Sequence, residues 1–182
     1  MIGADVARGD ATDYSAFHIF DIEQCTQVGE YKGKLSPKDF GNMLVGIAAE
    51  YNEALLVIEN ANIGWATIET VMEREYRNLY YSATSQMETV ESYMTKYERD
   101  KLVPGFTMSA RTRPLVIAKM IEYIREHSVT IQSKRLMAEM RVFVWKNGKA
   151  QAQIRYNDDL LIACATALYV RDTALRLRQQ GR

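Results

Sequence analysis

Short apolar runs separated by polar turns occupy the first part of the chain and predict β-strands. The first run, residues 2–7, is apolar apart from Asp5, and residues 15–22 and 26–32 follow it after brief polar segments. Consecutive strands with such short links pair in the antiparallel sense. The pattern therefore predicts three antiparallel strands at the start of the fold.

The next part of the chain predicts a buried strand between two helices. Ser36 and Pro37 are typical of a helix start, and apolar residues then recur at helical spacing. Residues 54–58 form a continuous apolar run, which is typical of a strand buried on both faces. A helix is predicted over residues 63–76 and a short strand over 79–81. This order predicts a parallel pair with a right-handed crossover.

The second half of the chain predicts mainly helices. The pattern weakens between residues 82 and 110, which indicates an exposed segment. Helices are predicted after Pro114, over residues 134–141 and over 158–178, and a hairpin is predicted around Asn147-Gly148. Together these elements predict an α/β fold of the ribonuclease H-like kind. Its mixed sheet has three antiparallel strands followed by parallel ones, with helices on both faces.

Composition narrows the class of protein. At 182 residues, 47% hydrophobic and 25% charged, the chain fits one globular domain. A formal net charge of +0 argues weakly against tight autonomous binding of DNA, although a local basic groove is compatible with it. No apolar run reaches the roughly 18 residues of a membrane span, and no signal peptide is evident. Because the first strand starts at residue 2, we expect the chain to be a piece of a longer protein.

Several chemical groups are absent or remote from one another in the sequence. Cys25 and Cys164 fit no metal or redox spacing. Cys164 lies in an apolar helix pattern, so we expect it to be a buried free thiol, and this use of cysteine fits a reducing, cytosolic setting. His18 and His127 are isolated, which favours packed or surface histidines over catalytic bases. No phosphate loop with P-loop spacing exists, so we expect no ATP hydrolysis.

Carboxylates stand at the ends of three predicted elements. Asp5 interrupts the first strand, Glu59 ends the buried strand, and Asp158 and Asp159 open the last helix behind Asn157 as its N-cap. Converging carboxylates repel one another, and a hard cation removes that penalty. A site of Asp and Glu oxygens without Cys or His suits Mg²⁺ or Mn²⁺. The pattern therefore predicts a metal-dependent phosphoryl-transfer site.

Each carboxylate also has a structural alternative. Asp5 could pair with Arg8, Glu59 could be solvated at a strand end, and acidic residues at a helix start are stabilised by the helix dipole. Adjacent helical residues point about 100° apart, so Asp158 and Asp159 should differ in role. We expect Asp159 to be the direct ligand.

Three acidic motifs resemble those of the nuclease domain of the large terminase subunit of tailed bacteriophages, the motor that packages viral DNA. The similar segments are residues 5–9 with 13–15, 58–64, and 157–163, together with 105–114. The resemblance spans nearly the whole chain. It implies a single nuclease domain over residues 1–182, without the N-terminal ATPase domain of the full family protein.

The resemblance implies a divalent-metal-dependent endodeoxyribonuclease that cuts concatemeric viral duplex DNA during genome packaging, with little sequence preference. Asp5, Glu59 and Asp159, with Asp158, would hold two Mg²⁺ or Mn²⁺ ions about 4 Å apart for phosphodiester hydrolysis. Implied partners are double-stranded DNA, the terminase ATPase domain, the small terminase subunit and the portal. The implied location is the cytoplasm of the infected host bacterium, without secretion. We expect no membrane association and a monomer in isolation.

Basic residues near these motifs are candidates for DNA contacts. They are Arg8, Arg111, Arg113, Lys134, Lys146 and Lys149, with Lys32, Lys34, Arg135 and Arg155 as further candidates. Lys146 and Lys149 are favoured because they lie at the hairpin tip just before the acidic helix. Contacts of this kind position a DNA backbone without reading sequence, and they weaken with salt.

Two other classes of function stay open at this point. Another ribonuclease H-like nuclease, such as a Holliday-junction resolvase or a ribonuclease H, would use the same carboxylates; a resolvase would prefer four-way junctions. A non-catalytic docking module of a packaging motor would use the acidic cluster to hold a structural cation.

Overall fold

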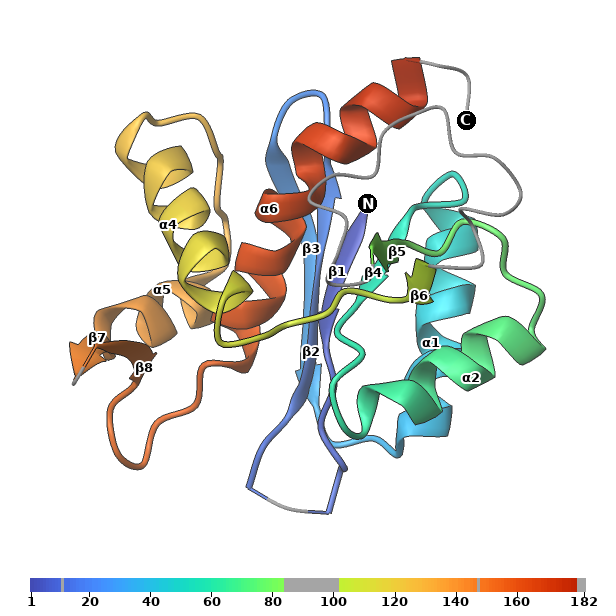
Figure 1. Ribbon diagram of the computed structural model, residues 1–182, viewed down its shortest axis with the longest axis horizontal. Helices are drawn as coiled ribbons and strands as arrows, with labels where there is room; N and C mark the ends of the chain where they lie inside the picture. The colour runs from blue at the N-terminus through green and yellow to red at the C-terminus, as the bar shows by residue number, and fades with distance from the viewer. Residues whose placement is uncertain (11, 84–101, 147, 180–182) are drawn as a thin grey trace.

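A four-stranded mixed sheet lies at the centre of the molecule, with strand order β3-β2-β1-β4 (Figure 1). The computed structural model describes residues 1–10, 12–83, 102–146 and 148–179, apart from the side chains of residues 149 and 177. The strands are β1 (Ile2–Asp5), β2 (Ser15–Asp21), β3 (Thr26–Gly33) and β4 (Leu56–Ile58). β1, β2 and β3 pair antiparallel, and β4 pairs parallel to β1. The predicted mixed α/β sheet is confirmed.

Helices cover both faces of this sheet. The elements are α1 (Pro37–Glu50) and α2 (Gly64–Glu73) on one face, and α6 (Asp159–Gln179) on the other, with α4 (Thr112–Arg125) and α5 (Lys134–Arg141) outside it. Successive strand residues alternate between the two faces. Ile2 and Ala4 accordingly join the core beneath α1 and α2, whereas Met1 and Val57 join the core beneath α6. The same alternation turns Asp5 toward α6.

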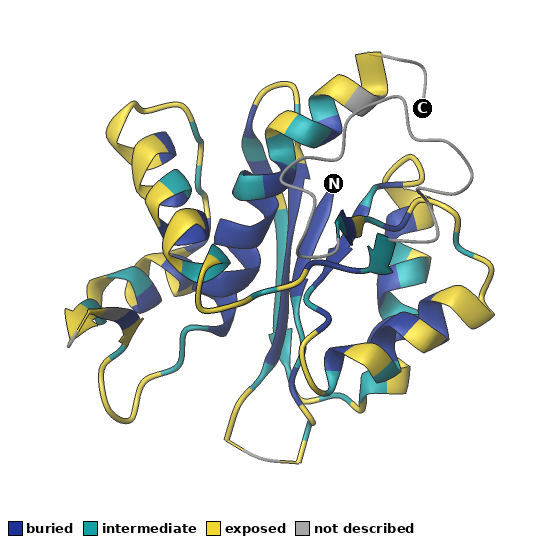
Figure 2. Ribbon diagram, in the orientation of Figure 1, coloured by how far each residue is buried: buried dark blue, intermediate teal, exposed yellow. Residues whose placement is uncertain are grey.

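The first half of α6 is buried on all sides, because it lies between the sheet and the outer helices (Figure 2). It also lies unusually close to β1. A Cβ atom on Gly3 would come within 2.6 Å of both the Ala163 carbonyl oxygen and the Ala167 Cβ. The small residues at these positions let the helix rest directly on the strand.

Local sequence signals set several boundaries as predicted. Ser36 and Ser133 each accept a backbone N–H from the first turn of the helix that follows, at 3.1 and 2.9 Å. The predicted hairpin forms from β7 (Phe143–Lys146) and β8 (Lys149–Ala152), and Gly148 in its turn has a φ of 75°. Such a positive φ is easily reached only by glycine and a few polar residues. Cys164 is a buried free thiol, as predicted.

The region after α2 differs from the prediction. Residues 79–81 contribute only an isolated parallel bridge, Leu56 to Leu79, to the central sheet. The chain then forms β5 (Tyr81–Ala83), which pairs antiparallel with β6 (Leu102–Pro104), a strand that the weak pattern there did not indicate. Residues 84–101 of the predicted exposed segment lie outside the described residues. None of the described helices is long and apolar enough to span a membrane.

Candidate metal-binding site

Asp5 and Glu59 lie side by side at the ends of neighbouring strands. The parallel register pairs Ala4 with Ile58, so Asp5 and Glu59 are the next residues on the two strands. The Glu59 backbone N–H donates to the Ala4 carbonyl at 3.0 Å. Both carboxylates belong to the sheet face that α6 covers, since side chains alternate along each strand.

The backbone around Glu59 is fixed on both sides. On the side of β4 away from β1, the Phe106 N–H donates to the Ile58 carbonyl at 2.7 Å, and the Phe106 carbonyl accepts from the Asn60 N–H at 3.0 Å. The turn that follows also requires a glycine, because a Cβ on Gly64 would come within 1.9 Å of the Glu59 carbonyl oxygen. The segment 58–64 therefore places Glu59 with little freedom.

A cavity of about 420 Å³ opens between these strand ends and the start of α6. All four carboxylates singled out from the sequence line it: Asp5, Glu59, Asp158 and Asp159. The exposed ring of Tyr156 lines it as well. The fold thus brings residues from the first strand, the fourth strand and the last helix to one place.

Negative charge accumulates at the bottom of this cavity. Burial first, and then the charges of Glu59, Asp159 and Asp158, raises the pKa of the Asp5 carboxyl well above its usual value. Burial also raises the pKa of Glu59, against the opposing charge of Arg113. A cation placed between these groups would relieve both effects.

The structural alternative for Asp5 is wrong. Arg8, the partner that would neutralise it, instead pairs with Asp10 at 2.9 Å, and both side chains are exposed. Within the described part of the chain, no ion pair reaches Asp5. A charged carboxylate in such a place costs several kcal/mol unless something compensates it.

Asp158 and Asp159 have different surroundings. The Asp158 carboxylate pairs with Arg113 at 2.8 Å and its side chain is 28% exposed. The Asp159 carboxylate pairs with Lys32 at 3.0 Å, and its side chain is only 10% exposed. Asp159 is therefore enclosed, whereas Asp158 lies nearer the rim.

The prediction that Asn157 caps the last helix is wrong. α6 begins at Asp159, and the Asp158 carbonyl accepts its first backbone bond, from Ile162 at 2.8 Å. The Asn157 amide donates instead to the Thr12 carbonyl at 3.1 Å and to Asp159 at 3.3 Å. Its side chain therefore ties the β1–β2 loop to the acidic start of the helix.

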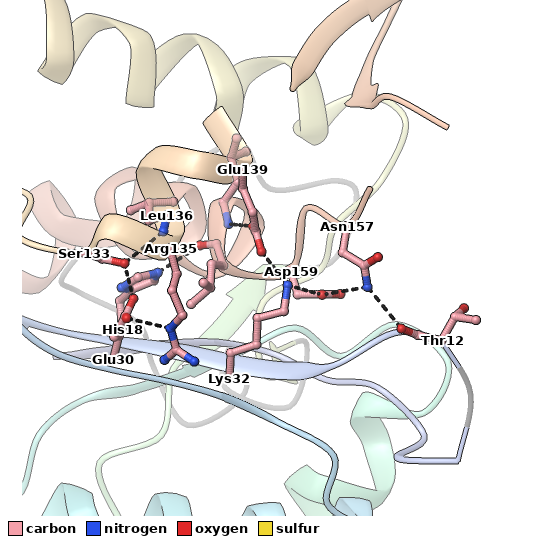
Figure 3. Close-up of polar contacts among 12 residues, drawn as sticks. Thr12, His18, Glu30, Lys32, Ser133, Arg135, Leu136, Glu139, Asn157 and Asp159 are labelled. Carbon is pink, nitrogen blue, oxygen red and sulfur yellow. Dashed lines mark hydrogen bonds and ion pairs between the residues drawn. The ribbon is translucent and has the colours of Figure 1, made fainter. Parts of the chain in front are cut away.

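A carboxylate from another helix takes over the capping. Oε2 of Glu139, on α5, accepts the Leu161 N–H at 2.9 Å, one of the donors that a helix start leaves free (Figure 3). Oε1 of Glu139 accepts from Lys32 at 2.5 Å. Burial alone would lower the pKa of Lys32, but its hydrogen bonds to Glu139 and Asp159 outweigh burial and raise it. The sequence reasoning missed Glu139, because nothing local to residue 139 indicates that it caps α6.

The donor set fits a hard divalent cation. It offers carboxylate oxygens without His or Cys, and the Asp5 carboxylate has no ion-pair partner among the residues that the structure describes. In the arrangement described, no three His, Cys, Asp or Glu side chains are close enough together to bind one ion. Asp158 and Asp159 face Arg113 and Lys32, so binding an ion requires these carboxylates to share or exchange their partners.

The basic candidates for DNA contacts occupy varied positions. Exposed ones include Arg8, Arg111, Lys134 and Lys146. Arg113 differs, because its Nε also contacts the Ala150 carbonyl on β8 at 3.4 Å, which links the hairpin to Asp158. The side chain of Lys149 lies outside the described residues. His18 is fully buried away from the cavity, as predicted for a packed histidine.

Sequence comparisons identify no relative: no family model and no curated protein matches the chain. Comparison of structures finds proteins of similar fold. The large terminase nuclease from thermophilic phage G20c with bound magnesium matches with a TM-score of 0.68 at 17% identity, over 92% of this chain and 78% of that one. The nuclease domain of the Thermus phage P74-26 large terminase matches with a TM-score of 0.61 at 18% identity, over 93% and 76%.

A structure from human cytomegalovirus extends this similarity. The human cytomegalovirus terminase nuclease domain, Mn-soaked and inhibitor-bound, matches with a TM-score of 0.59 at 12% identity, over 97% of this chain and 85% of that one. Likeness at such low identity establishes the fold. The chain has the ribonuclease H-like fold of large terminase nuclease domains.

Proposed function

We propose that the chain is a divalent-metal-dependent endodeoxyribonuclease of the large terminase type, which cuts concatemeric viral duplex DNA during genome packaging with little sequence preference. The observation that carries this proposal is the convergence of four carboxylates on one cavity in this fold. Neighbouring structures of the G20c nuclease hold magnesium, cobalt or zinc, and the cytomegalovirus domain was soaked with manganese. We infer that Mg²⁺ or Mn²⁺, as a pair of ions, serves this chain.

The proposed ligands are Asp5, Glu59 and Asp159, with Asp158 at the rim. When bound, the ions would supply an activated water and stabilise the leaving oxygen of the phosphodiester. The chain itself contributes fixed geometry. β1 and the backbone bonds around Glu59 hold two carboxylates rigidly, and the capped start of α6 presents the other two.

The proposed partners follow from the same likeness. They are duplex DNA, the terminase ATPase domain, the small terminase subunit and the portal, in the cytoplasm of an infected bacterium. Arg8 at the cavity and Lys146 on the hairpin are exposed basic residues suited to the phosphate backbone.

Plasmid nicking and linearisation with Mg²⁺ or Mn²⁺ tests the proposal. Wild type should cut, whereas Asp5→Asn and Glu59→Gln should each abolish cutting, because each removes a ligand charge. Glu69→Gln is the matched control, since this exposed carboxylate on α2 does not line the cavity and its loss should leave cutting unchanged. Cutting that persists in both site variants would contradict the assignment.

A panel of substrates separates this function from related ones. The proposal expects linear and circular duplex DNA to be cut at comparable rates. A strong preference for four-way junctions would indicate a resolvase, and cutting confined to RNA–DNA hybrids would indicate a ribonuclease H. A folded wild-type protein that binds both metal and DNA but cuts none of these substrates would indicate a docking module.

A further inference from the structure

A nearly buried ion cluster includes one of the proposed metal ligands and two charged residues that contact one another. Its members are Lys32 on β3, Glu139 on α5 and Asp159 at the start of α6 (Figure 3). The Lys32 ammonium lies 2.5 Å from Glu139 Oε1 and 3.0 Å from Asp159 Oδ2. The three side chains are only 10–15% exposed.

The position of Lys32 follows from the sheet. In the β2–β3 register Lys32 is opposite Ala16, which belongs to the core beneath α6, so its side chain rises on the same face as Asp5. The ammonium also lies 5.0 Å from the centre of the Tyr14 ring, a distance that suits a cation–π contact. Lys32 is therefore held by contacts on several sides, and its low exposure makes it a poor candidate for DNA.

The contacts to Asp159 fall on one of its two carboxylate oxygens. Lys32 and the Asn157 amide both approach Oδ2, at 3.0 and 3.3 Å. Oδ1 takes part in neither contact, although Asp159 lines the cavity. This arrangement fixes the rotation of the carboxylate and divides the roles of its two oxygens.

Glu139 contacts both the Lys32 side chain and the backbone of α6. One of its oxygens holds the Lys32 ammonium, and the other accepts the Leu161 N–H in the first turn of α6. A single carboxylate thus couples the side chain that orients Asp159 to the helix turn that carries it.

We propose that Lys32 and Glu139 are positioning residues for Asp159, which hold its Oδ2 so that Oδ1 is presented to the metal. This inference rests on the proposed function, because it assigns a support to one of that site's ligands. Partners of this kind orient a ligand, and removing them typically weakens metal binding about 10- to 100-fold.

The test measures Mn²⁺ binding by calorimetry alongside DNA cutting. Lys32→Met keeps most of the length of the side chain and removes its charge, and it should weaken Mn²⁺ binding about 10- to 100-fold. Lys32→Arg should recover part of this loss. The control is Lys34→Met, since Lys34 is exposed just beyond β3 and should leave Mn²⁺ affinity unchanged.

Glu139→Gln provides a second, independent variant. An amide oxygen can still accept the Leu161 N–H, but the negative charge that holds Lys32 is removed. We expect weaker Mn²⁺ binding and a lower kcat at saturating DNA, with KM for DNA unchanged. Circular dichroism and melting in EDTA verify that each variant compared is folded.

Three outcomes would overturn the positioning role. Unchanged Mn²⁺ affinity with only a lower melting temperature would mean that the cluster merely stabilises the fold. Tighter Mn²⁺ binding in Lys32→Met would mean that the ammonium competes with the metal. A raised KM for DNA with a reduced salt slope would make Lys32 a DNA contact. Wild type that binds no Mn²⁺ would overturn the proposed function as well, which separates that failure from the first three.

Discussion

Buried His18 should make the stability of the domain depend on pH. Its Nε2 lies 3.0 Å from the Leu160 carbonyl oxygen, so this nitrogen carries the proton and donates it. Nδ1 then accepts from the Gln27 amide at 2.7 Å. The Gln27 oxygen accepts the N–H groups of Gln132 and Ser133 at 2.8 and 2.9 Å. Only neutral His18 satisfies this chain of hydrogen bonds, because protonated Nδ1 would place two donors face to face.

Burial lowers the pKa of His18 from 6.5 to about 4, although the nearby Glu30 carboxylate acts in the opposite direction and Arg135 adds to the lowering. Between these two pKa values the unfolded chain binds the proton and the folded chain does not, so stability falls as pH falls. At about 1.4 kcal/mol per pKa unit, the loss at pH 4 amounts to about 3 kcal/mol relative to pH 7. Above pH 6.5 the contribution of His18 should be flat.

Urea unfolding in EDTA, repeated from pH 7.5 to 4, measures this loss. We expect His18→Gln to be less stable at neutral pH, because Gln27 loses its acceptor, and to lose about 3 kcal/mol less than wild type on acidification. The comparison is between the two slopes, since Asp5 and Glu59 titrate in both proteins. His127→Gln removes an exposed histidine and should keep the wild-type slope. Equal slopes for wild type and His18→Gln would refute the reasoning.

Four further predictions concern the cavity and its surroundings. Asp5→Asn should raise the melting temperature in EDTA at neutral pH by about 2 °C or more, because the raised pKa means that ionised Asp5 destabilises the metal-free fold. The same variant should abolish the further rise in melting temperature that Mn²⁺ gives wild type. For the same reason, calorimetry should show wild-type Mn²⁺ affinity falling as pH is lowered, and an affinity that is level down to pH 5 would contradict this. Lys146→Ala with Lys149→Ala should lower the salt slope of DNA binding by about 0.9 for each phosphate that these lysines neutralise, and an unchanged slope would exclude the hairpin from the DNA interface. Gly64→Ala should cost about 1–3 kcal/mol in urea unfolding, since the added Cβ meets the Glu59 carbonyl oxygen, and wild-type stability would show that the turn can yield.

Elements fixed by local chemistry were predictable from the sequence. The helix over 134–141 was placed correctly because Ser133 caps it from the adjacent position, and the hairpin was placed because Asn-Gly favours its turn. β6 was missed because it has only three residues and exists through its pairing with β5. A strand defined by its partner leaves little periodicity of its own.

Some parts of the candidate site were likewise predictable from the sequence, and others were not. Asp5 and Glu59 could be brought together from element order alone, because a parallel pair places successive strand ends at one edge. The capping of α6 could not be foreseen, since Glu139 reaches it from another helix and displaces the local candidate, Asn157. From the sequence alone, Lys32 is a candidate DNA contact, because no sequence pattern reveals that α5 and α6 close over it.

Because the cavity is built from both the first strand and the last helix, it can form only late in the synthesis of the chain. Among the described elements, translation delivers β1 before all others and α6 after them. Until α6 emerges from the ribosome, the sheet face that bears Asp5 lacks most of its apolar cover and the start of the helix contributes no carboxylates. Under the proposed function, a chain whose synthesis stops before Asp158 and α6 lacks two of the four proposed ligands and should not cut the nucleic acid around it.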